Sequence, residues 1–279
     1  MTAGKKKVLT EDEAKALLRR YGIQTPLYKI VERPEDLDSV GLEYPLVMKV
    51  CSPDILHKTD VGGVMLGIKD AKELAAAYKQ MRDKFPGSKV LVERMETGGI
   101  EVIVGLLDDP TFGMSIMFGL GGIFAEALRD VTFRVVPITK KDADQMIGEL
   151  KGSRVFKNFR GMQVDRGALI SLLLSVSKLG EDYVGKIDQL DINPVFVRGK
   201  ECIAIDAKVL FKPSLAGKEG LIQETSSGTA GKEGLIQETS SGTAGKEGLI
   251  QETSFTKGRQ GPPLDTTPSE EHVPMGAYK

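Results

Sequence analysis

His57 is the residue of this chain whose chemistry is easiest to define. The sequence holds only two histidines, His57 and His272, and imidazole is a nucleophile that titrates near neutral pH. His57 lies in the segment KVCSPDILHKTDVGG, residues 49–63, where Gly62 and Gly63 and several charged residues are typical of a polar loop. A lone histidine in a loop is more often a surface residue than a catalyst, so its position alone leaves both interpretations open.

Lys49 and two hard oxygen donors could serve a bound phosphate group. Lys49 ends an apolar run beside the histidine loop, where an ammonium group can neutralise phosphate oxygens or simply be solvated. Asn193 and Asp206 are 13 residues apart, a spacing that suits a hairpin. Such a pair can hold Mg²⁺ together with water and substrate phosphates. An Asx turn before a proline and a strand-end aspartate explain the same residues without a metal.

Gly121 and Gly122 follow a strand-like run in FGLGGIFAEALRD. Glycines at the start of a helix let backbone N–H groups approach an anion. A turn is the simpler interpretation of such a cluster.

The elements that must position these residues follow from hydrophobic periodicity and turn residues. Thr10 and Glu13 form a capping-box signature before a helix that ends at Gly22. The pattern predicts an α+β fold without regular βαβ alternation. Strands are expected over 27–31, 46–50, 63–68, 89–93, 100–107, 114–119, 187–190, 195–197 and 202–205, and further helices over 35–40, 70–82, 140–150 and 165–183.

Composition excludes several classes of protein. The net charge of -1 gives no bulk electrostatic attraction to nucleic acid or to an anionic membrane. No apolar run approaches the roughly 18 residues that span a bilayer, and no apolar h-region of a signal peptide follows the basic N-terminus. Cys51 and Cys202 are too few for a disulfide scaffold or a zinc cluster. We therefore expect a cytoplasmic protein.

A repeat begins after the last apolar pattern. AGKEGLIQETSSGT occurs at Ala216 and Ala230, and a copy that is truncated after Ser254 begins at Ala244. Each copy offers only one leucine and one isoleucine, too little to bury a core. We expect residues 213–279 to be a flexible tail, either an artificial, epitope-like array or a native low-complexity segment.

Taken in order, the segments KVCSPDILHKTDVGGV, VERMETGGIEVIVG, FGLGGIFAEALRD, DINPVF and AIDAK resemble a known family. Residues 8–212 are similar to the ATP-grasp (β) subunit of the NDP-forming acyl-CoA synthetases, most closely the ADP-forming acetyl-CoA synthetases of archaea. The β subunit of succinyl-CoA synthetase is a more distant relative. The resemblance implies an ATP-grasp fold of two lobes with the nucleotide between them.

The implied activity is that of an acid–thiol ligase that conserves energy as ATP. Acyl-CoA, ADP and phosphate are converted to the free acid, CoA and ATP. In this family a CoA-binding α subunit carries the first phosphohistidine, and the ATP-grasp subunit receives the phosphoryl group on a second one. His57 matches that second histidine, so the resemblance implies a phosphohistidine at His57. It also implies ATP/ADP and Mg²⁺ as cofactors and an α2β2 heterotetramer.

The remaining roles are carried over from the family's motifs. Lys49 matches the lysine that contacts nucleotide phosphates, and Asn193 and Asp206 match the Mg²⁺ ligands. Asp191 stands where the succinate enzyme has a glutamate that steadies the phosphohistidine, and its side chain is one methylene shorter.

The adenosine half of the nucleotide has its own matches. Glu93, Arg94 and Met95 match the hinge whose backbone reads the adenine edge, and Glu101 matches an acid on the ribose side. Gly121 and Gly122 match the position of phosphate contacts.

The resemblance divides the chain into an N-terminal helical segment (1–22), a small lobe with the histidine loop (23–93), a large lobe (94–212) and the tail (213–279). Two other functions remain open. The chain could be another ATP-grasp acid ligase that works through a free acyl phosphate, or a non-catalytic nucleotide-sensing subunit.

Overall fold

The computed structural model describes residues 6–55, 57–122, 130–158 and 164–213. The predicted repeat tail therefore lies outside the described residues, except for Pro213. The strands are β1 (Lys7–Val8), β2 (Tyr28–Val31), β3 (Leu46–Cys51), β4 (Val64–Ile68), β5 (Lys89–Arg94), β6 (Ile100–Asp109), β7 (Gly113–Leu120), β8 (Val131–Val135), β9 (Ile187–Arg198), β10 (Glu201–Ala204) and β11 (Ala207–Phe211). The helices are α1 (Glu11–Arg20), the 3-10 helix η1 (Pro34–Ser39), α2 (Ala71–Lys84), α4 (Lys140–Glu149), α5 (Val155–Asn158) and α6 (Arg166–Asp182).

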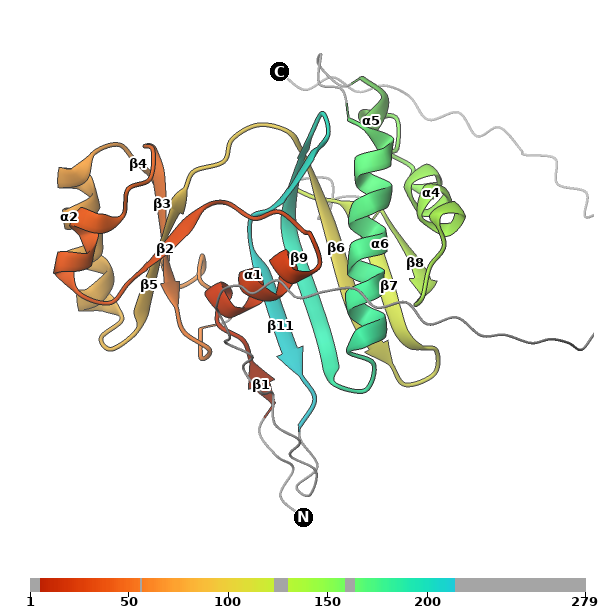
Figure 1. Cartoon of the computed structure of the whole chain (residues 1–279), viewed down its shortest axis with the longest axis horizontal. Helices are drawn as coiled ribbons and strands as arrows, with labels where there is room; N and C mark the ends of the chain where they lie inside the picture. Colours follow the sequence, from red (N-terminus) through yellow and green to blue (C-terminus); the bar gives the residue numbers. More distant parts are fainter. Residues whose placement is uncertain (1–5, 56, 123–129, 159–163, 214–279) are drawn as a thin grey trace, which may run out of the picture. The chain divides into compact units, whose positions relative to one another are not determined.

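A four-stranded antiparallel sheet is formed by the described residues between 28 and 94, in the order β2-β5-β3-β4. The central strand β3 is buried along its whole length, which explains its continuous apolar run. Helix α2 packs against this sheet (Figure 1), and it also contacts η1. Asp70 caps α2 by accepting a hydrogen bond from the backbone N–H of Glu73 at 2.8 Å. The predicted apolar face of this helix is buried.

The larger sheet runs in the order β1-β11-β9-β6-β7-β8, with β10 also paired to β9, and every described pairing in it is antiparallel. Helix α6 packs on β6 and β7, and α4 packs on α6 and β8 (Figure 1). The apolar side chains predicted for α6 are all buried in the core beneath it, namely Leu169, Leu172, Leu173, Val176 and Leu179. The α+β prediction is therefore confirmed.

Two predicted strands, 187–190 and 195–197, prove to be one strand, β9. Val102 pairs with Val195 and Val104 with Ile192, so Ile103 alone faces Asn193 and Pro194. Two residues opposite one is the count of a β-bulge, and a bulge tolerates a proline because a ladder hydrogen bond is already interrupted there. The expectation of two strands was wrong because the proline was interpreted as a strand end.

The N-terminal elements belong to the larger sheet, although they precede the smaller one in sequence. β1 pairs with β11, and α1 contacts β11. Tyr28 on β2 donates its hydroxyl to the carbonyl of Asp12 in α1 at 3.2 Å. α1 therefore contacts both sheets, and this places its first turn beside the candidate site. Among the described helices, none is long and apolar enough to cross a membrane.

Candidate nucleotide and phosphoryl-transfer site

Lys49 is a buried cation with three acceptors. Its side chain projects from β3 and is 5% exposed. Its Nζ lies 2.7 Å from Glu11 Oε1, 2.8 Å from Glu93 Oε1 and 2.9 Å from the carbonyl oxygen of Ile205. Burial alone would lower the pKa of Lys49, but Glu11 and Glu93 outweigh it and raise that pKa above its usual value. An ammonium group has three N–H donors, so this lysine must release a partner before it can bind a phosphate.

Glu11 connects the charged groups of this cluster, and sequence reasoning missed it. Its Oε1 lies 3.0 Å from Lys15 as well as 2.7 Å from Lys49, and its Oε2 lies 2.8 Å from Lys58. Glu93 also pairs with Lys15. Burial would raise the pKa of Glu11, but the three lysines outweigh burial and hold it well below the usual range. This carboxylate therefore stays charged although its side chain is only 1% exposed.

The sequence does contain a signal for this cluster. Glu11, Ala14, Lys15 and Leu18 recur at i, i+3, i+4 and i+7, so all four lie on one face of α1. All four are buried. Charged residues within an apolar stripe mark a buried ion pair, because an unpaired charge is rarely buried.

The histidine loop touches this cluster through Lys58. His57 itself is exposed, whereas the Lys58 side chain is only 11% exposed. Its Nζ lies 2.8 Å from Glu11 Oε2 and donates to Asp206 Oδ1 at 3.0 Å. Burial opposes the charge of Lys58, but Glu11 and Asp206 outweigh burial and raise its pKa. The loop residue next to His57 therefore contacts a predicted metal ligand.

Two glycines fix the end of this loop. Gly62 has φ +64°, a left-handed conformation that favours glycine. A Cβ on Gly63 would lie 2.5 Å from Val50 Cγ1. Gly63 also donates its N–H to the carbonyl of Lys58 at 2.6 Å and accepts from Val50 N at 2.8 Å. The glycine pair therefore anchors the loop to β3.

The structure places Asn193 and Asp206 side by side. Asn193 N donates to the carbonyl of Asp206 at 3.2 Å, which continues the pairing of β9 and β11. The hairpin expected from their spacing is present. Among the described residues, no three His, Cys, Asp or Glu side chains cluster as metal ligands. An amide oxygen and a carboxylate fit Mg²⁺, which needs only one or two protein oxygens when phosphates and water complete its shell.

Asp191 occupies the next row of the same sheet, two residues before Asn193. It pairs with Lys208 on β11 and Gly105 on β6. Burial raises the pKa of Asp191, Lys208 offsets part of this, and Asp206 adds to the rise. Successive odd positions of a strand share a face, so Asp191 lies next to the pair predicted to hold Mg²⁺.

The predicted adenine hinge lies at the end of β5. The N–H groups of Arg94 and Met95 donate to the carbonyls of Leu27 and Pro45, each at 3.0 Å. The Glu93 carboxylate belongs to the buried cluster. Both N–H groups already have partners, so recognition of the adenine edge at this segment stays a prediction.

Glu101 and the two glycines come together. Gly121 N donates to the Glu101 carbonyl at 2.8 Å, and a Cβ on Gly121 would lie 3.0 Å from Glu101 Cβ. Gly122 has φ +59°, and a Cβ there would lie 2.9 Å from Glu101 Oε2. The backbone at Gly121 and Gly122 lies so close to Glu101 on β6 that a side chain at either position would collide with it. The predicted contacts of Gly121 and Gly122 with phosphate, and of Glu101 with ribose, stay predictions.

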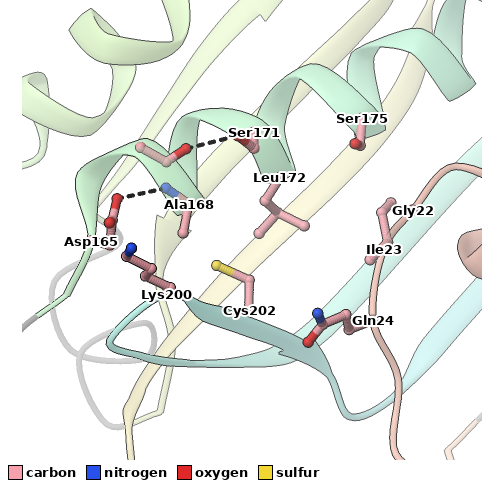
Figure 2. Close-up of a pocket in the computed structure, with 11 residues that line it drawn as sticks. Gly22, Ile23, Gln24, Asp165, Ala168, Ser171, Leu172, Ser175, Lys200 and Cys202 are labelled. Carbon is pink, nitrogen blue, oxygen red and sulfur yellow. Dashed lines mark hydrogen bonds between the residues drawn. The ribbon is translucent and has the colours of Figure 1, made fainter.

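A separate pocket of about 440 Å³ lies beside α6 (Figure 2). Asp165 accepts the Ala168 N–H at 3.0 Å, and Ser171 donates its hydroxyl to the Gly167 carbonyl at 2.9 Å. Cys202 lies on the opposite wall. Among the described residues, none of the predicted site residues lines this pocket, so we assign no role to it in the chemistry.

Comparison with known proteins places these features in context. A family model described as an ATP-grasp domain matches residues 1–211. The β subunit of ADP-forming acetate–CoA ligase II from Pyrococcus furiosus is 41% identical over 216 residues, which cover 73% of this chain and 92% of that protein. ADP-forming acetate–CoA ligase II from Archaeoglobus fulgidus is 38% identical over 205 residues, which cover 73% of this chain and 30% of that protein.

A solved structure is also similar. It is the dinucleotide-forming acetyl-coenzyme A synthetase 1 of Candidatus Korarchaeum cryptofilum, in complex with coenzyme A and Mg-AMPPCP. Its phosphohistidine segment points towards the nucleotide binding site. The TM-score is 0.65 at 36% identity, and the match covers 74% of this chain and 93% of that one.

Proposed function

The chain belongs to the ATP-grasp family, as its sequence predicted, and we propose that it is the nucleotide-binding, phosphoryl-transferring subunit of an ADP-forming acetate–CoA ligase. The observation that carries this proposal is the contact between the histidine loop and the nucleotide-side cluster. Lys58 reaches Asp206 at 3.0 Å, and His57 beside it is exposed. His57 is the only histidine among the described residues. The loop thus presents a nucleophile next to a pair of oxygen donors that suits Mg²⁺.

The proposed step is transfer of one phosphoryl group between His57 and the nucleotide. In the direction of ATP hydrolysis, an imidazole nitrogen of His57 attacks the γ-phosphorus, the bond to the β–γ bridging oxygen breaks, and ADP leaves. In the direction of ATP synthesis, a β-phosphate oxygen of ADP attacks the phosphohistidine and restores the free imidazole. Bound Mg²⁺ screens the negative charge of the phosphates. Asn193 and Asp206 would hold it.

A partner subunit is part of this proposal. The Pyrococcus relative is a β subunit, and the Archaeoglobus relative is matched over 30% of its length. We infer that a CoA-binding α subunit forms the acyl phosphate and carries the first phosphohistidine, in an α2β2 assembly. The acid is chosen by that partner. A loop that moves between two sites would connect the two half-reactions.

The experiment is phosphorylation of the purified full-length chain with γ-labelled ATP and Mg²⁺. We expect a label on His57 that is lost in acid and stable in base. The variant His57→Ala should remove the label, whereas His272→Ala, which changes the other histidine, should keep it. Equal labelling of the His57→Ala protein would refute the phosphohistidine. A ligase with a free acyl phosphate, or a nucleotide sensor, would give no histidine label in any variant.

A further inference from the structure

The pocket beside α6 is separate from the candidate nucleotide site and has room for a small molecule. Its volume of about 440 Å³ lies within the range of sites that bind small ligands. Helix α6 forms one wall, and β10 with the turn before it forms the other (Figure 2). Leu172 on α6 and Cys202 on β10 point towards each other, and the buried Ile23 lines one end. The pocket therefore offers an apolar surface to a ligand.

A backbone donor on β10 is unpaired at this pocket. Ile205 N donates to the carbonyl of Pro194 on β9 at 2.9 Å. Ala204 N donates away from β9, to the carbonyl of Gln24 at 2.8 Å. Because N–H groups of an antiparallel strand point to the partner strand only at every second residue, the Cys202 N–H also points away from β9. Among the described residues, it has no hydrogen-bond partner, so it can donate to a ligand.

The unpaired stretch of β10 is short, and other segments of the chain close both of its ends. Gln24 pairs with Ile203 at one end, and Asp165 N donates to the carbonyl of the residue before Lys200 at 2.7 Å at the other. Within the part of the chain that the structure describes, the Lys200 carbonyl has no hydrogen-bond partner either. The edge thus offers one donor and one acceptor to a ligand about as long as a single residue. A peptide strand that adds along a sheet edge needs open ends.

Two opposite charges adjoin this donor and acceptor. Asp165 accepts the Ala168 N–H with Oδ1 at 3.0 Å, and among the described residues its Oδ2 has no partner. Lys200 is exposed, and Figure 2 shows its ammonium group beside Asp165 with no hydrogen bond between them. Burial, and then the charge of Asp165, raise the pKa of the Cys202 thiol to about 12. A simple anion would suit only the lysine and a simple cation only the aspartate, whereas a zwitterion suits both.

We propose that this pocket binds a free α-amino acid with an aliphatic side chain. The carboxylate of the amino acid accepts from the Cys202 N–H and lies near the Lys200 ammonium group. Its own ammonium group donates to the Lys200 carbonyl and to Asp165. The aliphatic side chain lies against Leu172 and Ile23. This site goes beyond the proposed function and does not depend on it.

The test is calorimetric titration of the full-length chain with L-leucine, in the absence of nucleotide and Mg²⁺. Two further probes keep the branched apolar part of leucine but lack one charged group. Isocaproate has no ammonium group, and isoamylamine has no carboxylate. We expect saturable binding of leucine and about tenfold weaker binding of each probe, because each lacks charge-assisted hydrogen bonds.

Four variants locate the site. Asp165→Asn removes a charge but keeps a residue that caps a helix equally well, and Lys200→Met removes the ammonium group; each should weaken leucine binding about tenfold. Ser175→Leu fills the pocket from α6 without changing a charge and should abolish binding. Lys141→Met changes an exposed lysine on α4, outside the pocket, and should bind leucine like the unchanged protein. Thermal unfolding checks that each variant is folded, and the exposed Lys200 serves as the test if Asp165→Asn is not.

Three results would each overturn the proposal. They are no saturable binding at millimolar leucine, binding of either probe as tight as that of leucine, and pocket variants that bind leucine like Lys141→Met. The titration needs neither His57 nor a nucleotide. Its failure therefore leaves the proposed function standing, and a missing histidine label leaves the amino acid site standing.

Discussion

Glu11→Gln should destabilise the protein strongly, because it removes the buried carboxylate that Lys15, Lys49 and Lys58 share. The Glu11 oxygens lie 2.7, 3.0 and 2.8 Å from Lys49, Lys15 and Lys58, and the side chain is 1% exposed. At an effective dielectric constant near 20, each pair is worth roughly 4 kcal/mol of Coulomb energy at a separation of about 4 Å, but the cost of desolvation cancels much of it. Removing one partner of a buried ion pair typically costs about 3–5 kcal/mol.

We expect a loss of unfolding free energy at the lower end of this range, about 3 kcal/mol. Lys15 and Lys49 still pair with Glu93 in the variant, and the glutamine side chain still offers one acceptor oxygen. For a folded body of roughly 200 residues, this loss lowers the melting temperature by about 6–12 °C. The assay is thermal unfolding at pH 7, with Glu181→Gln as control. Glu181 is a 48% exposed helix residue that pairs with Lys178 at 3.1 Å, and exposed pairs contribute little. The control should melt close to the unchanged protein.

The pH dependence gives a second check on Glu11. A carboxyl whose pKa is lowered on folding stabilises the protein above the ordinary glutamate pKa of about 4.5, and this contribution is lost as the pH falls. Lys49 has a raised pKa, so its contribution is full below the usual lysine pKa of 10.5 and is lost only above it. The difference in melting temperature between the unchanged protein and Glu11→Gln should be constant from pH 5 to pH 9 and should become smaller towards pH 3. A melting temperature like that of the control, or a difference that does not become smaller in acid, would refute the reasoning.

Two further predictions concern packing and the thiols. Gly63→Ala should lower the free energy of unfolding, measured in urea, by about 2 kcal/mol, because the new Cβ would lie 2.5 Å from Val50 Cγ1 and overpacking typically costs about 1–3 kcal/mol. The control Gly148→Ala, at an exposed position of α4, should leave that free energy unchanged or raise it. Equal changes in the two variants would contradict the prediction. Burial raises the pKa of Cys51 to about 11 and that of Cys202 to about 12, so neither thiol should react with iodoacetamide at pH 8 until urea unfolds the protein. Mass spectrometry of the alkylated chain checks this, and rapid modification of the folded protein would contradict it.

Hydrophobic periodicity predicted the elements whose apolar residues face the core. The apolar faces of α2 and α6 are both buried. The sequence analysis missed strand β8, in which a polar residue points into the core and large apolar residues point to solvent. Thr132 is buried with its hydroxyl 3.3 Å from the Met146 carbonyl, whereas Phe133 and Val135 are 55% and 52% exposed. Alternation is present in this strand, but the sequence does not show which set of residues points inward.

The candidate site was predictable to the extent that it is local in sequence. The spacing of Asn193 and Asp206 within one antiparallel hairpin was enough to place them together. The partners of Lys49 could not be found in the same way. Glu11 is 38 residues before it and Ile205 is 156 residues after it, so these contacts exist only once α1, β3 and β11 have come together. Lys49, Glu93 and Asp206 of the cluster were predicted as separate site residues, whereas Glu11 and Lys15 were missed although they form a charged stripe on α1.

The buried ion-pair cluster around Glu11 has equal numbers of positive and negative side chains without a ligand. A nucleotide phosphate that binds there must therefore compete with carboxylates for the lysines. Three lysines face three carboxylates, namely Lys15, Lys49 and Lys58 with Glu11, Glu93 and Asp206. A buried cation without a partner would be costly, so the carboxylates occupy the lysines while phosphate is absent. A phosphate group of a bound nucleotide would have to replace one of the carboxylates at Lys49, since all three N–H donors of Lys49 have acceptors in this structure. Binding would therefore exchange one ion-pair partner for another without burying a new unpaired charge.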